Sequence, residues 1–196
     1  MASLDGILDY IMGANGMKKV MRSSNKPTRF QDSNADHSYQ MIVMADILIE
    51  HFRLDLDFRK VTRYVYLHDI GEIGRETDIC AWQPDGTIID RKAKKQDERI
   101  VAHNFLGQYG LQNFAEIFDN YESQNDKESK FVRLLDKVEP MIFALYNGYE
   151  DFVKLEPYEF TIKNADVVAN GFPELAEFVN EVKQRFKDIY NELQEK

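Results

Sequence analysis

The sequence has very little of what a disulfide-stabilised or membrane-spanning protein needs. A single cysteine, Cys80, in 196 residues excludes a disulfide within the chain and a cysteine-rich zinc site. The first apolar stretch is interrupted by Asp5 and Asp9, and no window approaches about 18 uninterrupted apolar residues. We therefore expect a cytoplasmic protein with no signal peptide and no membrane contact.

Positive charge is also in short supply. The chain carries 25 Lys and Arg against 34 Asp and Glu, a formal net charge of −9. Such a balance argues against capture of a nucleic acid polymer or of an anionic membrane. Local cations must hold any anion that binds.

Long linkers and internal repeats are absent, and 43% of the residues are hydrophobic. A chain of this length and composition can bury one core, so we expect one domain over residues 1–196. Apolar residues at helical spacing predict an all-α fold. The helices are expected at about residues 4–22, 36–51, 58–69, 97–109, 111–121, 128–149 and 173–195. A Pro-Asp-Gly turn signal indicates a small hairpin or flap near residues 80–90.

The central motif is the pair His68-Asp69 at the end of the helix expected over residues 58–69. The spacing turns His68 inward, on a face shared with Phe58, Val61 and Val65. Gly71 and Gly74 are expected to end this helix. A buried carboxylate beside a buried histidine needs hydrogen bonds or a cation. The pair is therefore either a satisfied core hydrogen bond or half of a metal site.

Two further residues have the chemistry and the placement to complete such a site. His37 lies in the first turn of a helix that Asp36 is expected to cap, on a face with Met41, Met44 and Leu48. Asp136 lies at the edge of the apolar stripe of residues 128–149. His51 and His103 are interpreted as structural histidines.

The order His37, His68-Asp69, Asp136, with the histidines and Asp136 on three different predicted helices, resembles the HD-domain metal phosphohydrolases. The resemblance spans about residues 22–150, and the short arrangement is most similar to the 5′-deoxynucleotidases. It implies an HD-domain helical bundle with a further C-terminal helix at about residues 173–195. It also implies metal ligation by His37, His68, Asp69 and Asp136, with Glu72 and Asp69 as the catalytic carboxylates.

The same resemblance implies that Arg22 binds phosphate and that Asp78 contacts substrate. Two positions depart from the family pattern: Ser23 replaces a tryptophan, and Thr77 replaces an aspartate that here comes one residue later. Both departures leave sugar and base selectivity open. The cationic run at residues 91–95 is either a solvated face or a guide for phosphate.

Two imidazoles and two carboxylates suit one divalent ion such as Mn, Co, Fe, Ni or Zn. Together with the resemblance, this predicts hydrolysis of (deoxy)nucleoside 5′-monophosphates. Two alternatives stay open: an HD-type hydrolase of triphosphates or guanosine tetraphosphate, and a noncatalytic metal-binding or nucleotide-binding module. The expected partners are a nucleotide and a second copy of the chain in a homodimer.

Overall fold

Eight α-helices make up most of the chain that the structure describes. The computed structural model describes residues 2–22, 32–76, 89–147 and 158–194. Its helices are α1 (Leu4–Ala14), α2 (Asn34–Phe52), α3 (Phe58–Leu67), α4 (Arg91–Gln108), α5 (Gln112–Ser123), α6 (Lys127–Asn147), α7 (Tyr158–Ala169) and α8 (Ala176–Gln194). Short 3₁₀ helices occur at η1 (Asn15–Lys18), η2 (Ile70–Glu72) and η3 (Pro173–Leu175). The all-α prediction is confirmed, and the hairpin expected near residues 80–90 falls almost entirely outside the described residues.

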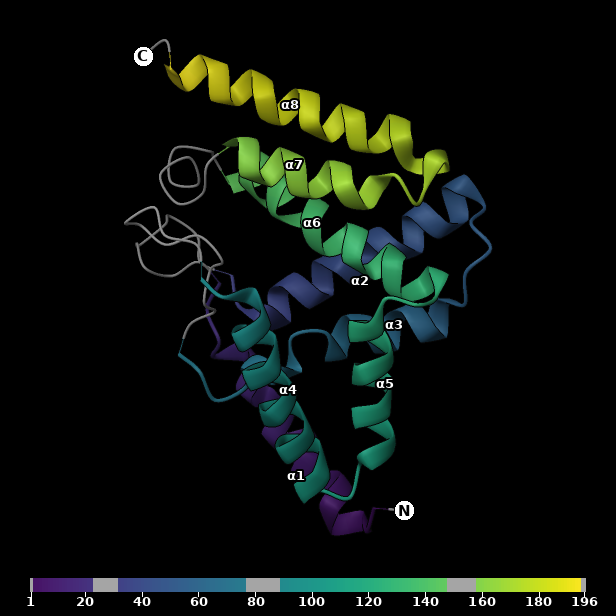
Figure 1. Ribbon diagram of the computed structural model, residues 1–196, viewed down its shortest axis with the longest axis vertical. Coiled ribbons are helices and arrows are strands. Elements are labelled where there is room, and N and C mark those ends of the chain that lie inside the picture. Colours follow the sequence, from purple (N-terminus) through teal and green to yellow (C-terminus); the bar gives the residue numbers. More distant parts are fainter. Residues whose placement is uncertain (1, 23–31, 77–88, 148–157, 195–196) are drawn as a thin grey trace.

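The helices form two end groups, with three further helices between them (Figure 1). Helices α7 and α8 lie side by side at one end, and α1, α4 and α5 lie at the other. Helices α2, α3 and α6 run between them, and each group has its own cluster of buried apolar side chains. None of the helices described here has the length and apolar character to cross a membrane.

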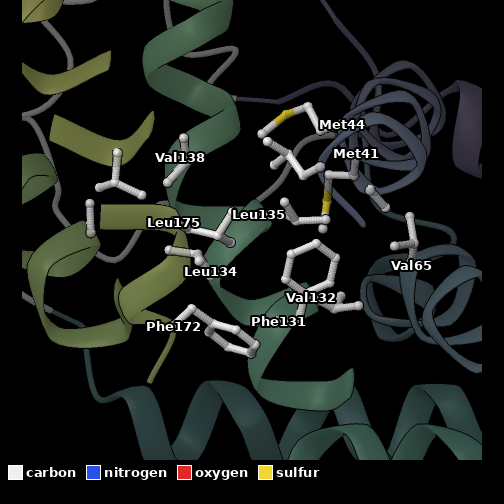
Figure 2. Packing of buried hydrophobic residues seen from close by; sticks show 14 of the residues in the cluster. Met41, Met44, Val65, Phe131, Val132, Leu134, Leu135, Val138, Phe172 and Leu175 are labelled. Atoms are coloured by element: carbon white, nitrogen blue, oxygen red, sulfur yellow. The ribbon is translucent and has the colours of Figure 1, made fainter. Parts of the chain in front are cut away.

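Helix α6 is the centre of the larger cluster. Its Phe131, Leu134, Leu135 and Val138 are each no more than 1% exposed, which confirms the predicted stripe. Figure 2 shows these side chains between residues of α2 and α3 on one side and residues near the start of α8 on the other. A helix packed on both sides is a rigid support, so polar groups that it carries inward are held firmly.

Two helices begin at a different residue from the one predicted. Ser33, not Asp36, caps α2: the Ser33 hydroxyl accepts from the Asp36 amide, and the Asp36 carboxylate accepts from the Ser33 amide. Helix α4 begins at Arg91, about two turns early, because Asp90 accepts hydrogen bonds from the next backbone amides. The cationic run therefore forms the first turns of a helix.

Two further differences from the sequence prediction concern α7 and α1. Helix α7 was not predicted; it carries β-branched residues, which weaken a helical signal in sequence. Helix α1 was predicted, but its apolar stripe is exposed, with Leu4 at 81% and Ile11 at 58%. Its packed side carries Gly6, which lies against the Tyr109 backbone, and Tyr10, whose ring packs against that of Phe105.

The two glycines after His68 have different roles. Gly74 has a φ of +85°, as expected for a glycine that ends a helix. Gly71 is needed for a close approach: a Cβ there would lie 2.4 Å from the backbone oxygen of Glu98. Helix α4 thus packs directly on η2 and fixes the segment that follows His68.

We predict that Gly71→Ala lowers the free energy of unfolding by about 1–3 kcal/mol, because α4 must move away from η2. Denaturant unfolding measures this. Gly107→Ala is the matched control: it lies inside the same helix α4 with nothing within 4 Å of an added Cβ. That control should raise stability by about 0.5–1 kcal/mol. Equal effects of the two substitutions would contradict the close packing of α4 on η2.

Candidate metal centre

His37 lies in the first turn of α2, directly after the Ser33 cap. Its backbone amide donates to the Ser33 carbonyl at 3.0 Å, and its side chain is fully buried. Its Nδ1 lies 2.6 Å from a carboxylate oxygen of Glu139 on α6. Because an ionised carboxylate only accepts, Nδ1 must carry the proton and donate it. With the imidazole neutral, as a metal ligand must be, Nε2 then has a free lone pair.

His68 is the residue that ends α3, where the last backbone carbonyls lack helical partners. Its Nδ1 lies 2.6 Å from the Val65 carbonyl and donates to it. The ring is held further by Tyr121, whose ring packs edge-on at a centroid distance of 6.0 Å. In the neutral ring, His68 therefore also presents its Nε2 as a bare lone pair.

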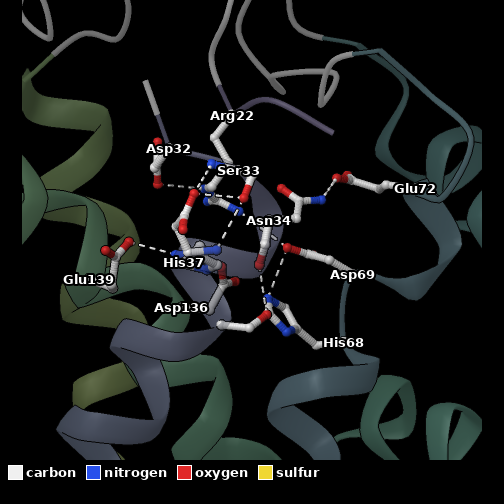
Figure 3. A network of polar contacts seen from close by, with 12 residues as sticks. Arg22, Asp32, Ser33, Asn34, His37, His68, Asp69, Glu72, Asp136 and Glu139 are labelled. Atoms are coloured by element: carbon white, nitrogen blue, oxygen red, sulfur yellow. Dashed lines mark hydrogen bonds and ion pairs between the residues drawn. The ribbon is translucent and has the colours of Figure 1, made fainter. Parts of the chain in front are cut away.

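These two nitrogens converge with a carboxylate from α6. Ligand atoms of His37, His68 and Asp136 all lie within 4.8 Å of one another, and the imidazole centroids are 5.4 Å apart. Figure 3 shows the three side chains pointing toward a common point. Both Nε2 atoms are buried without a hydrogen-bond partner among the residues that the structure describes. Burial without a partner is costly, so the arrangement favours a cation between these groups.

Asp69 lies next to this group. Its Oδ2 is 3.0 Å from His68 Nε2, near enough for both atoms to contact one ion, although they make no hydrogen bond. The same oxygen accepts from Arg22 Nη1 at 3.2 Å. Arg22 is brought there by backbone pairing, since its amide donates to the Asp32 carbonyl at 2.9 Å.

A second cluster shares His37. Asp32, His37 and Glu139 also have ligand atoms within 4.8 Å of one another. Here the His37 nitrogen nearest to Glu139 is Nδ1, which already holds the hydrogen-bonded proton. The two clusters therefore differ. The cluster with His68 and Asp136 presents the unpartnered Nε2 of His37 to a cation, whereas in the cluster with Asp32 and Glu139 the Nδ1 of His37 is occupied by a hydrogen bond.

Without a metal ion, the charged groups of the centre shift one another's pKa values. Burial and Arg22 lower the pKa of His37, but Glu139 and Asp136 outweigh them and raise it to about 9. Burial raises the pKa of Asp69, yet His68 and Arg22 bring it well below its usual range. The pKa of Asp136 is also well below its usual range: burial raises it, but Lys137 and both histidines lower it by more. Without a metal ion, the imidazolium of His37 supplies positive charge beside Asp136 and Glu139, in addition to the charges of Lys137 and Arg22.

Glu72 is buried at the end of η2, held by two donors. Asn34 Nδ2 donates to its Oε2 at 2.7 Å, and Lys94 Nζ lies 3.1 Å from its Oε1. Lys94 comes from the cationic run, so one member of that run contacts the predicted catalytic carboxylate. The side-chain oxygen Oδ1 of Asn34 is buried with no hydrogen-bond partner among the described residues.

The remaining predicted residues lie elsewhere. His51 is exposed at the end of α2, and His103 on α4 pairs with Asp119 at 3.1 Å, so both are outside the centre. Asp78 falls outside the described residues. Sequence reasoning assigned no role at the site to Asp32, Asn34 or Glu139, and it considered Lys94 only as part of the cationic run at residues 91–95. The position of Glu139, three residues after Asp136, was the one sequence signal for an acid there.

Comparison with known proteins identifies the family. A model of the HD domain matches residues 14–176, which include every residue of both clusters. The chain belongs to the HD domain family. It is 28% identical over 185 residues to human 5'-deoxynucleotidase HDDC2, covering 90% of this chain and 84% of that protein. The Bos taurus protein of the same name is 30% identical over 171 residues, covering 84% of this chain and 75% of that protein.

Solved structures show the same HD fold. A predicted metal-dependent phosphohydrolase from Magnetospirillum magnetotacticum superimposes with a TM-score of 0.61 at 17% identity, covering 93% of this chain and 96% of that chain. A conserved hypothetical protein from Pyrococcus furiosus gives a TM-score of 0.65 at 20% identity, covering 90% of this chain and 99% of that one. At these identities the likeness concerns the fold.

The residues of this HD domain fit the divalent metal ion that the family implies. Both imidazoles have their Nδ1 committed to an acceptor, which leaves Nε2 available for the ion. The neighbouring carboxylates are ionised at neutral pH, because their pKa values are low. Two nitrogens with carboxylate oxygens suit Mn, Fe, Co, Ni and Zn alike.

We predict that the metal-free protein loses stability as the pH rises from 6.5 to about 9. The folded-state pKa of His37 lies above its ordinary value, so the stability it contributes is complete below pH 6.5 and is lost as the folded protein deprotonates. Denaturant unfolding in chelator at several pH values measures this.

His37→Gln should flatten this pH dependence, whereas His51→Gln, at the exposed end of α2, should leave it unchanged. A slope that survives in His37→Gln would show that another group causes it.

Proposed function

We propose that this protein is a divalent-metal-dependent phosphohydrolase that removes phosphate from (deoxy)nucleoside 5′-monophosphates. The observation that carries the proposal is the convergence of two buried, bare imidazole nitrogens with Asp136, beside Asp69. The curated relatives named 5'-deoxynucleotidase, which match most of the chain, support the substrate class.

We assign His37, His68, Asp69 and Asp136 as the ligands of one divalent ion. When bound, such an ion lowers the pKa of its water, to about 7 in favourable zinc sites, and offsets charge on phosphoryl oxygens. The low-pKa carboxylates can bind a metal without first losing a proton, whereas His37, with a pKa of about 9, must release the proton on its Nε2 to become a ligand.

Glu72 is proposed to accept the proton of the attacking water. Its two donors, Asn34 and Lys94, favour the ionised carboxylate, which is the form that can take a proton. They also fix its position, since each of its oxygens is held by one of them. A proton acceptor held in place contributes more than one that must be ordered during the reaction.

Arg22 is proposed to hold nonbridging oxygens of the phosphoryl group. Its guanidinium is beside Asp69, with Asp32 4.0 Å from its Nε, so it lies next to the ligand cluster. A guanidinium presents several donors in a plane and matches phosphate oxygens well. The family resemblance also implies that Asp78 contacts the substrate. The leaving group of the proposed reaction is the nucleoside 5′-oxygen.

We further propose that residues 1–196 act as one cytoplasmic HD domain that forms a homodimer and takes a nucleotide, not a nucleic acid polymer. The net charge of −9 supports the exclusion of polyanions. Sedimentation of the purified protein tests the dimer.

We predict release of inorganic phosphate from ribo- and deoxynucleoside 5′-monophosphates when the protein is loaded with Mn, Co, Fe, Ni or Zn. A screen of the eight common monophosphates with each ion measures this. Pyrophosphate or triphosphate release from nucleoside triphosphates, with no phosphate from monophosphates, would contradict the proposal.

Glu72→Gln is the control for the same screen. It keeps a side chain of the same shape but cannot accept a proton, so turnover should fall by about 10²-fold or more while the metal content stays the same. Full activity in this variant would remove Glu72 from the mechanism.

A further inference from the structure

Glu139 is a buried acid that the proposed reaction does not use. It lies on α6 one turn after Asp136, is 2% exposed, and follows His37 by 102 residues in the chain. Its carboxylate accepts from His37 Nδ1 at 2.6 Å, a short hydrogen bond between two buried side chains. Burying a carboxylate is costly, so this contact needs an explanation.

The explanation lies in where the two histidines stand on their helices. His68 ends α3, where carbonyls without helical partners are available, and the Val65 carbonyl orients its ring. His37 stands in the first turn of α2. The groups left unpaired at that end of a helix are amides, which cannot accept a hydrogen bond. The ring of His37 therefore needs an acceptor from outside that end of α2, and Glu139 on α6 is that acceptor.

On the basis of the proposed metal centre, we propose that Glu139 is a positioning residue that holds His37 with its bare Nε2 directed at the site of the ion. By accepting from Nδ1, the carboxylate fixes both the tautomer and the rotation of the ring. It also makes the imidazole a stronger electron donor toward a cation. His37 Nε2 lies 3.5 Å from Asp136 Oδ1, so the orientation that Glu139 imposes is the one that completes the ligand group.

The test is the affinity of the folded protein for metal, measured without nucleotide. Competition of Co²⁺ or Zn²⁺ with a chromophoric chelator should give a 10- to 100-fold weaker affinity in Glu139→Ala than in the native protein. Glu139→Gln keeps an oxygen that can accept from Nδ1, so its affinity should fall clearly less than that of the alanine variant. The zinc-loaded protein should show a protected His37 Nδ1 proton by NMR, retained in Glu139→Gln and lost in Glu139→Ala.

Met141→Ala separates positioning from general packing. Met141 is fully buried on the same helix, two residues beyond Glu139, and carries no acidic or imidazole group. Its truncation should lower the midpoint of unfolding without changing metal affinity. A matching loss of affinity in Met141→Ala would attribute the effect of Glu139 to the stability of α6.

Two other results would overturn the positioning role. One is native metal affinity in folded Glu139→Ala. The other is an affinity in Glu139→Gln as poor as in Glu139→Ala, because it would make the negative charge itself, or direct ligation beside Asp32, the important property. The proposed function is tested by a different measurement, nucleotide hydrolysis. A protein that binds metal through His37 but hydrolyses no nucleotide would refute the substrate class and leave the role of Glu139 intact.

Discussion

His37 Nε2 and His68 Nε2 are buried with no hydrogen-bond partner among the described residues, and both face carboxylates. Bare lone pairs and negative oxygens repel one another, and the buried nitrogens have no hydrogen bond to offset this repulsion. The arrangement becomes favourable when positive charge is placed among them, either as a proton on His37 or as a divalent ion. This requirement links three helices, because α2 carries His37, α3 ends at His68 and α6 carries Asp136.

The position of each histidine at the end of a helix determines which group can orient its imidazole ring. His68 stands where α3 leaves carbonyls free, and His37 stands where α2 leaves amides free. One ring can therefore be oriented by its own helix, while the other depends on Glu139 from α6. Because α6 is packed on both faces (Figure 2), Asp136 and Glu139 are carried by a part of the fold that cannot shift without disturbing the core. The core therefore supports the two acidic side chains that α6 places at the metal centre.

Much of this was predictable from sequence, and the limits have physical causes. Helical periodicity determines which face a side chain occupies, so the inward placement of His37, His68 and Asp136 followed from the pattern of their neighbours. Periodicity does not say which distant group a buried side chain meets, and this is why the contact between His37 and Glu139 appeared only in the structure. The same applies to Gly71, whose packing against α4 depends on how two elements approach each other. The exposed apolar stripe of α1 shows that periodicity alone does not establish burial.

We propose that one divalent ion binds between the two imidazole Nε2 atoms and the carboxylates of Asp69 and Asp136. Anomalous diffraction from a crystal grown with Mn²⁺ or Co²⁺ tests it most directly. We predict one strong anomalous peak within coordination distance of His37 Nε2, His68 Nε2 and the two carboxylates. A peak between Asp32 and Glu139 instead, or no peak in a protein that hydrolyses nucleotides, would contradict the account.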